Sequence, residues 1–189
     1  MKKFFAVSLL VPSFAFSQSL VTTTAQMRTG LLEDFTGIHC GYCPDGHAIM
    51  ASIAAANPGQ VSLVGVHAGV FAVPANGTEP DFRTPQGDSL NAFYNVNSYP
   101  SGVINRHGFT GGAAQGRGSW EGNMAQMLGM TSPVNLGVES SYDAGSQQLT
   151  VHVQLYYTAD SPDGDDHISV LLTENHILGW QTDYGPEGN

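Results

Sequence analysis

Apolar residues in this chain follow both strand and helix spacing, which predicts an α/β fold. Short apolar stretches at 29–35, Val61–His67 and Val103–Arg106 have the length and composition of buried strands. The stretch Cys43–Ala56 holds few helix-breaking residues and is rich in Ala, Ile and Met, which predicts a helix. A shorter helix is predicted over Asp88–Val96, opened by one of its first two residues. The first half of the chain thus alternates strands with helices.

The second half changes from helix spacing to strand spacing after Ser132-Pro133. Before that point, Trp120–Met130 carries apolar residues at near-helical intervals, and the Gly-rich stretch 108–118 predicts turns. After it, three stretches alternate apolar with polar residues, the apolar positions being Val134, Leu136, Val138, then Leu149, Val151, Val153, Leu155, then Ile168, Val170, Leu172. Turn residues separate them at 143–146 and 161–165.

Three or four strands are few for a closed β-sandwich, which needs about seven. We therefore expect 132–189 to be the start of a sandwich-like, incomplete β-rich region. Either the chain is a fragment of a longer protein, or a partner completes the sheet.

Cys40 and Cys43 are the only two cysteines, and they stand directly before the predicted helix. The N–H groups and the dipole of a helix N-terminus favour the thiolate of the first cysteine. The spacing suits one reversible disulfide. An inert structural bond is the alternative, although closing so short a loop constrains the unfolded chain very little.

Segments 34–43 and 93–105 around this pair resemble the thioredoxin superfamily. The resemblance implies a thioredoxin-like fold in which Pro100 is the family's cis-proline and Tyr99, before it, offers backbone groups to a substrate peptide. It also implies that Asp34 is a buried carboxylate that helps deprotonate the resolving cysteine, Cys43.

The chain departs from the thioredoxin pattern close to the cysteines. His39 stands where Trp is usual, and Gly41-Tyr42 stands where Gly-Pro is usual; with Tyr99 and Pro100 these residues form the predicted substrate-binding set. A protonated His39 beside Cys40 would stabilise its thiolate, so the reductase and oxidase directions both stay open. Residues 68–87 are predicted to be an insertion.

The run from Leu31 to Gly37 into the cysteine pair, followed by Pro44-Asp45-Gly46-His47, resembles the Omp28-related family of exported outer membrane proteins. The resemblance is strongest over 31–104. It implies a thioredoxin-like region followed by β-rich sequence.

The first residues have the pattern of a secretory signal peptide. Lys2 and Lys3 precede an apolar stretch over Phe4–Phe16, with small residues before Gln18. We expect a signal peptide at 1–17, a thioredoxin-like domain at 18–131 and the β-rich region at 132–189. The apolar stretch is shorter than the ~20 residues of a membrane-spanning helix, so no transmembrane segment is expected in the mature chain. The location is therefore periplasmic, outer membrane or extracellular.

The chain is acidic, which excludes electrostatic binding of nucleic acid. Six Lys and Arg face sixteen Asp and Glu, for a formal net charge of −10. Loss of Lys2 and Lys3 with the signal peptide leaves no lysine and a net charge of −12.

These patterns predict an exported thiol–disulfide oxidoreductase that acts on protein thiols or disulfides of the cell envelope and exchanges electrons with a redox partner. Cys40 is the expected nucleophile, Cys43 resolves the mixed disulfide, and Asp34 manages its proton. No cofactor and no metal are expected. The alternative is a non-catalytic envelope or surface binding protein on a thioredoxin-like scaffold, since fold does not imply function.

The sequence also offers two metal-binding sites as weaker alternatives to the redox interpretation. His39, Cys40, Cys43 and His47 have side chains that could bind zinc or copper. The acidic residues between Asp160 and Asp166 could gather round calcium, but their spacing does not match an EF-hand loop and fits a solvated turn.

Overall fold

The computed structural model describes residues 19–161 and 164–185, so the predicted signal peptide lies outside the described residues. Two compact units divide the described chain. The smaller one combines 19–25 with 133–161, and the larger one combines 26–132 with 164–185. Three α-helices and two sheets in these residues confirm the predicted α/β class. The domain boundaries expected from the sequence stay predictions.

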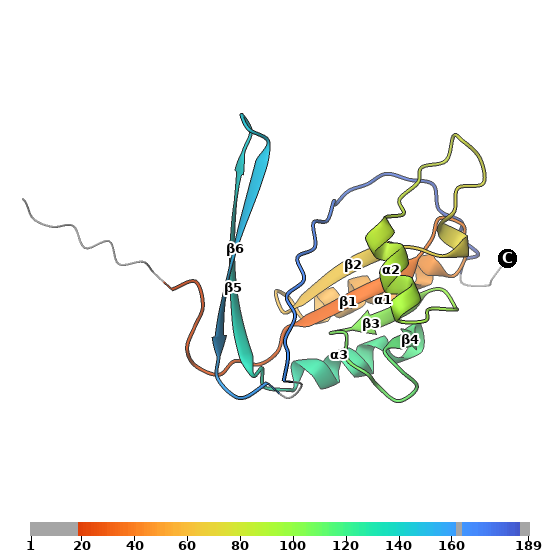
Figure 1. The fold of residues 1–189 in the computed structure, drawn as a ribbon. Coiled ribbons are helices and arrows are strands. Elements are labelled where there is room, and N and C mark those ends of the chain that lie inside the picture. Colours follow the sequence, from red (N-terminus) through yellow and green to blue (C-terminus); the bar gives the residue numbers. More distant parts are fainter. Residues whose placement is uncertain (1–18, 162–163, 186–189) are drawn as a thin grey trace, which may run out of the picture. The chain divides into compact units, whose positions relative to one another are not determined.

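The larger unit is organised around the central strand β1 (Gly30–Thr36). It pairs in parallel with β2 (Val61–His67) and antiparallel with β3 (Ser101–Ile104), which pairs antiparallel with β4 (Ala114–Gly116). The strand order is β2-β1-β3-β4 (Figure 1). Because β1 is covered on both faces and has a strand on each side, nearly all of its residues are buried.

Helices cover both faces of this sheet. On one face, α1 (Cys43–Ala56) and α3 (Trp120–Leu128) share a core with the sheet, and on the other face α2 (Pro85–Phe93) packs through Leu90. Two short 3₁₀ turns, η1 (Val70–Ala72) and η2 (Arg117–Ser119), connect these elements. The core under α1 and α3 comprises Leu32, Met50, Ile53, Ile104, Trp120, Met124 and Met127.

The start of α2 differs from the sequence prediction. The helix begins at Pro85, three residues before Asp88. Thr84 caps it, since its side-chain oxygen accepts a hydrogen bond from the Gly87 N–H at 3.0 Å. Pro85 suits the first helical position, where its missing N–H costs nothing. The Thr-Pro pair was therefore the true start signal.

A buried ion pair joins the centre of β1 to the residues after β3. Glu33 is fully buried, and Arg106 donates from Nε and Nη2 to its two carboxylate oxygens at 3.0 and 2.7 Å. Both carboxylate oxygens are satisfied by a paired cation, which makes burial of the charge tolerable.

The smaller unit is built on one long hairpin, β5 (Val134–Asp143) and β6 (Gln148–Tyr157), as the alternation predicts. Residues opposite each other in an antiparallel pair share a face, so the pairs Leu136–Leu155 and Val138–Val153 lie on one face. Leu136 and Val138 are both 57% exposed. The hairpin thus presents an apolar face that the other described residues of the smaller unit leave largely uncovered.

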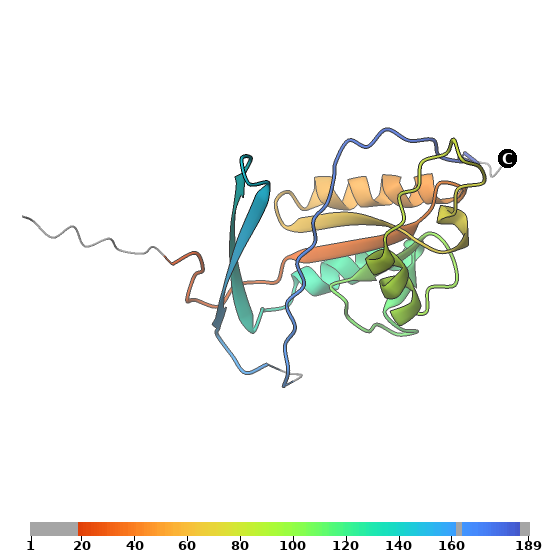
Figure 2. The same cartoon turned by 45° about the horizontal axis from the view of Figure 1, so that its top comes forward.

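The third predicted strand, at Ile168–Leu172, is wrong: these residues lie in neither a helix nor a strand. They belong to the extended segment 164–185 of the larger unit. Figures 1 and 2 show this segment running outside the β2 edge toward the end of the sheet where β1 leads into α1. Alternation shows that a segment can form a strand, but a strand also needs a partner to pair with.

Candidate functional site

The two cysteines form a disulfide at the end of β1, as the spacing suits. Cys40 lies in the loop after β1, Cys43 is the first residue of α1, and their Cα atoms are 5.4 Å apart. Cys40 is therefore three residues before the helix rather than at its first position. Cys40 is 3% exposed and Cys43 is fully buried. The disulfide is formed and closed off from solvent.

The disulfide loop is covered by residues 180–184, which we name the covering segment. Its backbone binds the loop twice, since the Thr182 N–H donates to the Ile38 carbonyl at 2.8 Å and the Tyr184 N–H donates to the Gly41 carbonyl at 3.0 Å. Nothing in the hydrophobic pattern of the sequence pointed to this contact.

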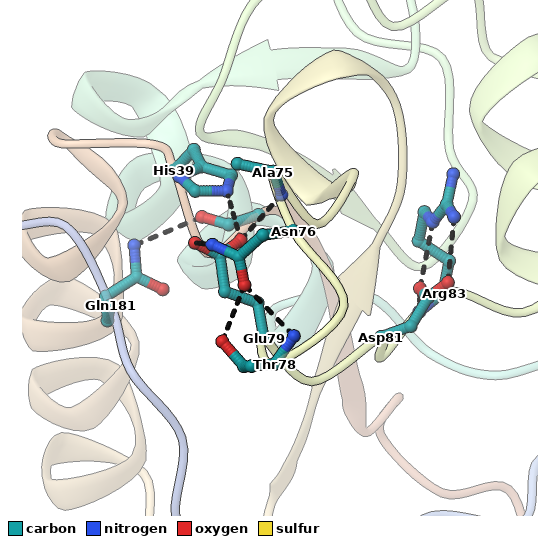
Figure 3. Close-up of polar contacts among 9 residues, drawn as sticks. His39, Ala75, Asn76, Thr78, Glu79, Asp81, Arg83 and Gln181 are labelled. Atoms are coloured by element: carbon teal, nitrogen blue, oxygen red, sulfur yellow. Dashed lines mark hydrogen bonds and ion pairs between the residues drawn. The ribbon is translucent and has the colours of Figure 1, made fainter.

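The side chain of Gln181 adds two further hydrogen bonds. Its Nε2 donates to the carbonyls of Gly37 at 3.1 Å and Cys40 at 3.0 Å. Figure 3 shows Gln181 reaching from the covering segment toward the loop. Four loop carbonyls, at residues 37, 38, 40 and 41, thus accept hydrogen bonds from the covering segment.

Aromatic rings flank these hydrogen bonds. Trp180 packs edge-on to His39 with ring centroids 5.2 Å apart, and Tyr184 packs edge-on to Tyr42 at 5.3 Å. Gly41 lies directly against the Tyr184 ring, where any added Cβ would collide with it. The glycine between the cysteines is therefore what lets the ring approach the loop.

His39 has a carboxylate partner that the sequence did not reveal. Its Nε2 lies 2.9 Å from an oxygen of Glu79 (Figure 3). Hydrogen bonds from the Ala75 N–H first, and then from His39 and Asn76, hold the pKa of Glu79 below its usual value. The Nε2 of His39 therefore faces the Glu79 carboxylate, a contact that the expected role of His39 beside Cys40 did not include.

Asp34 is buried in the sheet, as the resemblance implies. It is fully buried, and burial raises the pKa of its carboxyl, with His47 partly opposing the rise. The Nε2 of His47 lies 3.3 Å from one carboxylate oxygen and 3.3 Å from the Thr36 hydroxyl. Neither carboxylate oxygen has a hydrogen-bond partner among the described residues. His47 stands one turn after Cys43 on α1, so this pair joins the central strand to the helix that carries the second cysteine.

Tyr99 and Pro100 directly precede β3 and contact different helices. The peptide bond between them is cis, as the resemblance implies. Pro100 is buried, and a Cβ on Gly46 of α1 would be only 3.0 Å from its ring. The Tyr99 hydroxyl donates to Asn91 at 2.7 Å. Pro100 therefore packs against the cysteine helix, while the Tyr99 side chain is held by α2.

Tyr42 is the exposed member of the predicted set. Its ring lies under the guanidinium of Arg117, 5.5 Å from the ring centroid, and Arg117 also pairs with Asp45. A hollow of about 320 Å³ adjoins this ring, lined by the loop, Arg117 and Asp183. A second hollow, of about 940 Å³, lies between the β2 edge and residues 170–181.

The zinc or copper alternative gains no support from the described residues, and the calcium alternative includes Asp163, which lies outside them. Cys40 and Cys43 are bonded to each other, so their thiolates are not free to bind a metal in this state. Among residues 19–161 and 164–185, no three His, Cys, Asp or Glu side chains are placed to hold an ion.

Comparison with protein families decides the family. Residues 87–189, more than half of the chain, match the model of the outer membrane protein Omp28. The chain belongs to the Omp28 family. The match lies mostly beyond the stretch 31–104, where the resemblance of the sequence motifs is strongest. As an Omp28-family protein, the chain is exported, with an envelope or surface location.

Among solved structures, HBP35 of Porphyromonas gingivalis is similar to this Omp28-family chain, with 18% identity and a TM-score of 0.46. The similarity covers 61% of this chain, which spans only 38% of HBP35. No curated protein matches the sequence. Within the part of the chain that the structure describes, none of the helices combines the length and apolar character needed to cross a bilayer.

Proposed function

We propose that this Omp28-family chain is a non-catalytic binding protein of the cell envelope or surface, built on a thioredoxin-like scaffold. One observation carries the proposal: both cysteines are buried and the chain's own covering segment lies over their loop. A catalyst of protein disulfide exchange must present a sulfur to a second protein. In the described state, neither cysteine presents its sulfur to a second protein.

The thioredoxin-like scaffold is supported by the arrangement of the larger unit. A sheet of order β2-β1-β3-β4 has helices on both faces, and the cysteine loop joins the central β1 to α1. The binding role is supported by the apolar face of the β5–β6 hairpin, where Leu136, Val138 and Tyr142 are exposed. Exposed apolar patches of this kind mark protein interaction sites.

The second candidate is thiol–disulfide exchange, which the Asp34–His47 pair favours. In that reaction the Cys40 thiolate attacks a target disulfide and forms a mixed disulfide, and one target sulfur leaves as a thiolate. Cys43 then gives its proton to Asp34, attacks Cys40 and releases the second target sulfur. His39, Gly41, Tyr42, Tyr99 and Pro100 would contact the substrate.

Turnover and trapping separate the two candidates. A binding protein gives no acceleration of insulin reduction by dithiothreitol, measured as turbidity, and Cys43→Ser forms no mixed disulfides with envelope proteins. Cys40→Ser is the matched control. Acceleration by the wild type, together with mixed disulfides on Cys43→Ser and none on Cys40→Ser, would establish exchange with Cys40 as nucleophile.

A further inference from the structure

We propose that the face of the Cys40–Cys43 loop is a docking surface for an extended peptide, that the covering segment is its resident occupant, and that the disulfide becomes reducible only when this segment leaves. The proposal concerns access to the disulfide. It holds whether the pair is structural or catalytic, and so does not depend on the proposed function.

The loop offers the backbone groups that an extended peptide needs. Its carbonyls at residues 37, 38, 40 and 41 all receive hydrogen bonds from the covering segment, two of them from backbone N–H groups. Backbone recognition of this kind accepts an extended chain with little demand on its sequence, and flanking side chains then supply specificity.

Two aromatic contacts supply that specificity. His39 takes an aromatic ring at one end of the loop and Tyr42 takes one at the other, with the Gln181 amide between them. The matching feature of the occupant is Trp180-Gln181 followed by Tyr184. A peptide with a donor amide flanked by two aromatic residues is the chemistry that this surface fits.

The stretch that leads into the covering segment has no regular structure to hold it, and Arg106 donates one hydrogen bond to its Ser169 hydroxyl at 3.0 Å. Residues 164–179 form no helix or strand, and Leu172 and Leu178 are 85% and 97% exposed. The 940 Å³ hollow separates much of this stretch from the β2 edge. A short segment held by a few hydrogen bonds and two ring contacts opens locally far more often than the core unfolds.

Opening has a defined chemical consequence. A thiolate of dithiothreitol attacks one sulfur of the pair, the S–S bond breaks, and the other cysteine leaves as a thiolate that takes a proton from water. The second thiol of dithiothreitol then displaces the first and closes its own cyclic disulfide, so that two electrons pass to the cysteine pair. The attack needs an approach to sulfur that the covering segment blocks.

The test is the rate at which dithiothreitol reduces the oxidised full chain, measured by quenching with an alkylating reagent and counting alkylated cysteines. Tyr184→Ala removes the ring contact, and Gly41→Ala pushes the same ring away from the other side. Each is expected to raise the rate about five- to tenfold, since each removes one aromatic contact and loosens one hydrogen bond. Tyr156→Ala, an exposed tyrosine on the other face of the hairpin, is the matched control and leaves the rate unchanged.

The double variant guards against a direct effect of Gly41→Ala on the sulfurs. If both substitutions act by releasing the covering segment, Gly41→Ala with Tyr184→Ala is reduced about as fast as the faster single variant. A multiplied effect in the double variant would assign the Gly41→Ala effect to the loop itself. Rates equal to wild type in Tyr184→Ala overturn the proposal, whatever insulin turnover shows.

Discussion

Replacing Arg106 with Met is expected to lower the free energy of unfolding of the larger unit by about 2 to 4 kcal/mol. The substitution leaves Glu33 buried in the centre of β1 without the cation that satisfies both of its oxygens. Breaking a buried pair by removing one partner typically costs about 3 to 5 kcal/mol, and we expect the lower side because Arg106 keeps some contact with water.

Denaturant unfolding followed by tryptophan fluorescence measures this loss. Both tryptophans, Trp120 and Trp180, belong to the larger unit, so the signal reports that unit. Arg83→Met removes an exposed pair with Asp81 and is the matched control, expected to leave the midpoint close to wild type. The double variant Glu33→Gln, Arg106→Met should recover much of the loss. An Arg106→Met midpoint equal to that of the control would show that the buried pair contributes nothing.

Replacing Asp34 with Asn is expected to stabilise the larger unit at pH 7 by on the order of 1 kcal/mol or more, since an unsatisfied buried charge costs more than the unsatisfied neutral amide that replaces it. Asp34 is fully buried without a hydrogen-bond partner among the described residues, and its contact with His47 only partly offsets burial. Asparagine has nearly the same shape and carries no charge, so it avoids most of the desolvation cost.

The direction of the pKa shift of Asp34 determines how the stability of the larger unit depends on pH. Burial raises the pKa of Asp34 above its unfolded value, so the folded state binds the proton more tightly than the unfolded state. The stability from this proton is fully present below the unfolded pKa and is lost as pH rises through the raised pKa. The advantage of Asp34→Asn is therefore expected at pH 7 and should shrink toward pH 3.5.

Unfolding curves at the two pH values check this expectation. Asp45→Asn, an exposed carboxylate of the same region, controls for the general loss of a charge. An Asp34→Asn variant that is less stable than wild type at pH 7 would mean that the ion pair with His47 outweighs the cost of burial.

The spacing of apolar residues correctly predicted the elements that carry a clear helix or strand pattern in their own sequence. The strands at β1 and β2, helix α1 and the β5–β6 hairpin all follow from local apolar patterns and turn residues. The start of α2 was misplaced because its cap, Thr84, lies in a stretch that was interpreted as an insertion. The strand at Ile168–Leu172 was wrong because alternation does not reveal whether a pairing strand is present.

The site was predictable only in part. The disulfide and the burial of Asp34 follow from the cysteine spacing and the resemblance around it. Glu79 and Gln181 could not be found this way, because they reach His39 and the loop from 40 and 141 positions away in the sequence. Contacts between a loop and a distant extended segment leave no periodic trace.

The most direct test of the closed disulfide is amide hydrogen exchange of the oxidised protein, resolved for Thr182 and Tyr184 by NMR. These two N–H groups donate to the loop carbonyls of Ile38 and Gly41. The account predicts measurable protection of both amides relative to Leu178, for which no backbone hydrogen bond is seen among the described residues, and loss of that protection in Tyr184→Ala. Exchange of both amides as fast as in an unstructured peptide would contradict the account, because the disulfide loop would then be uncovered.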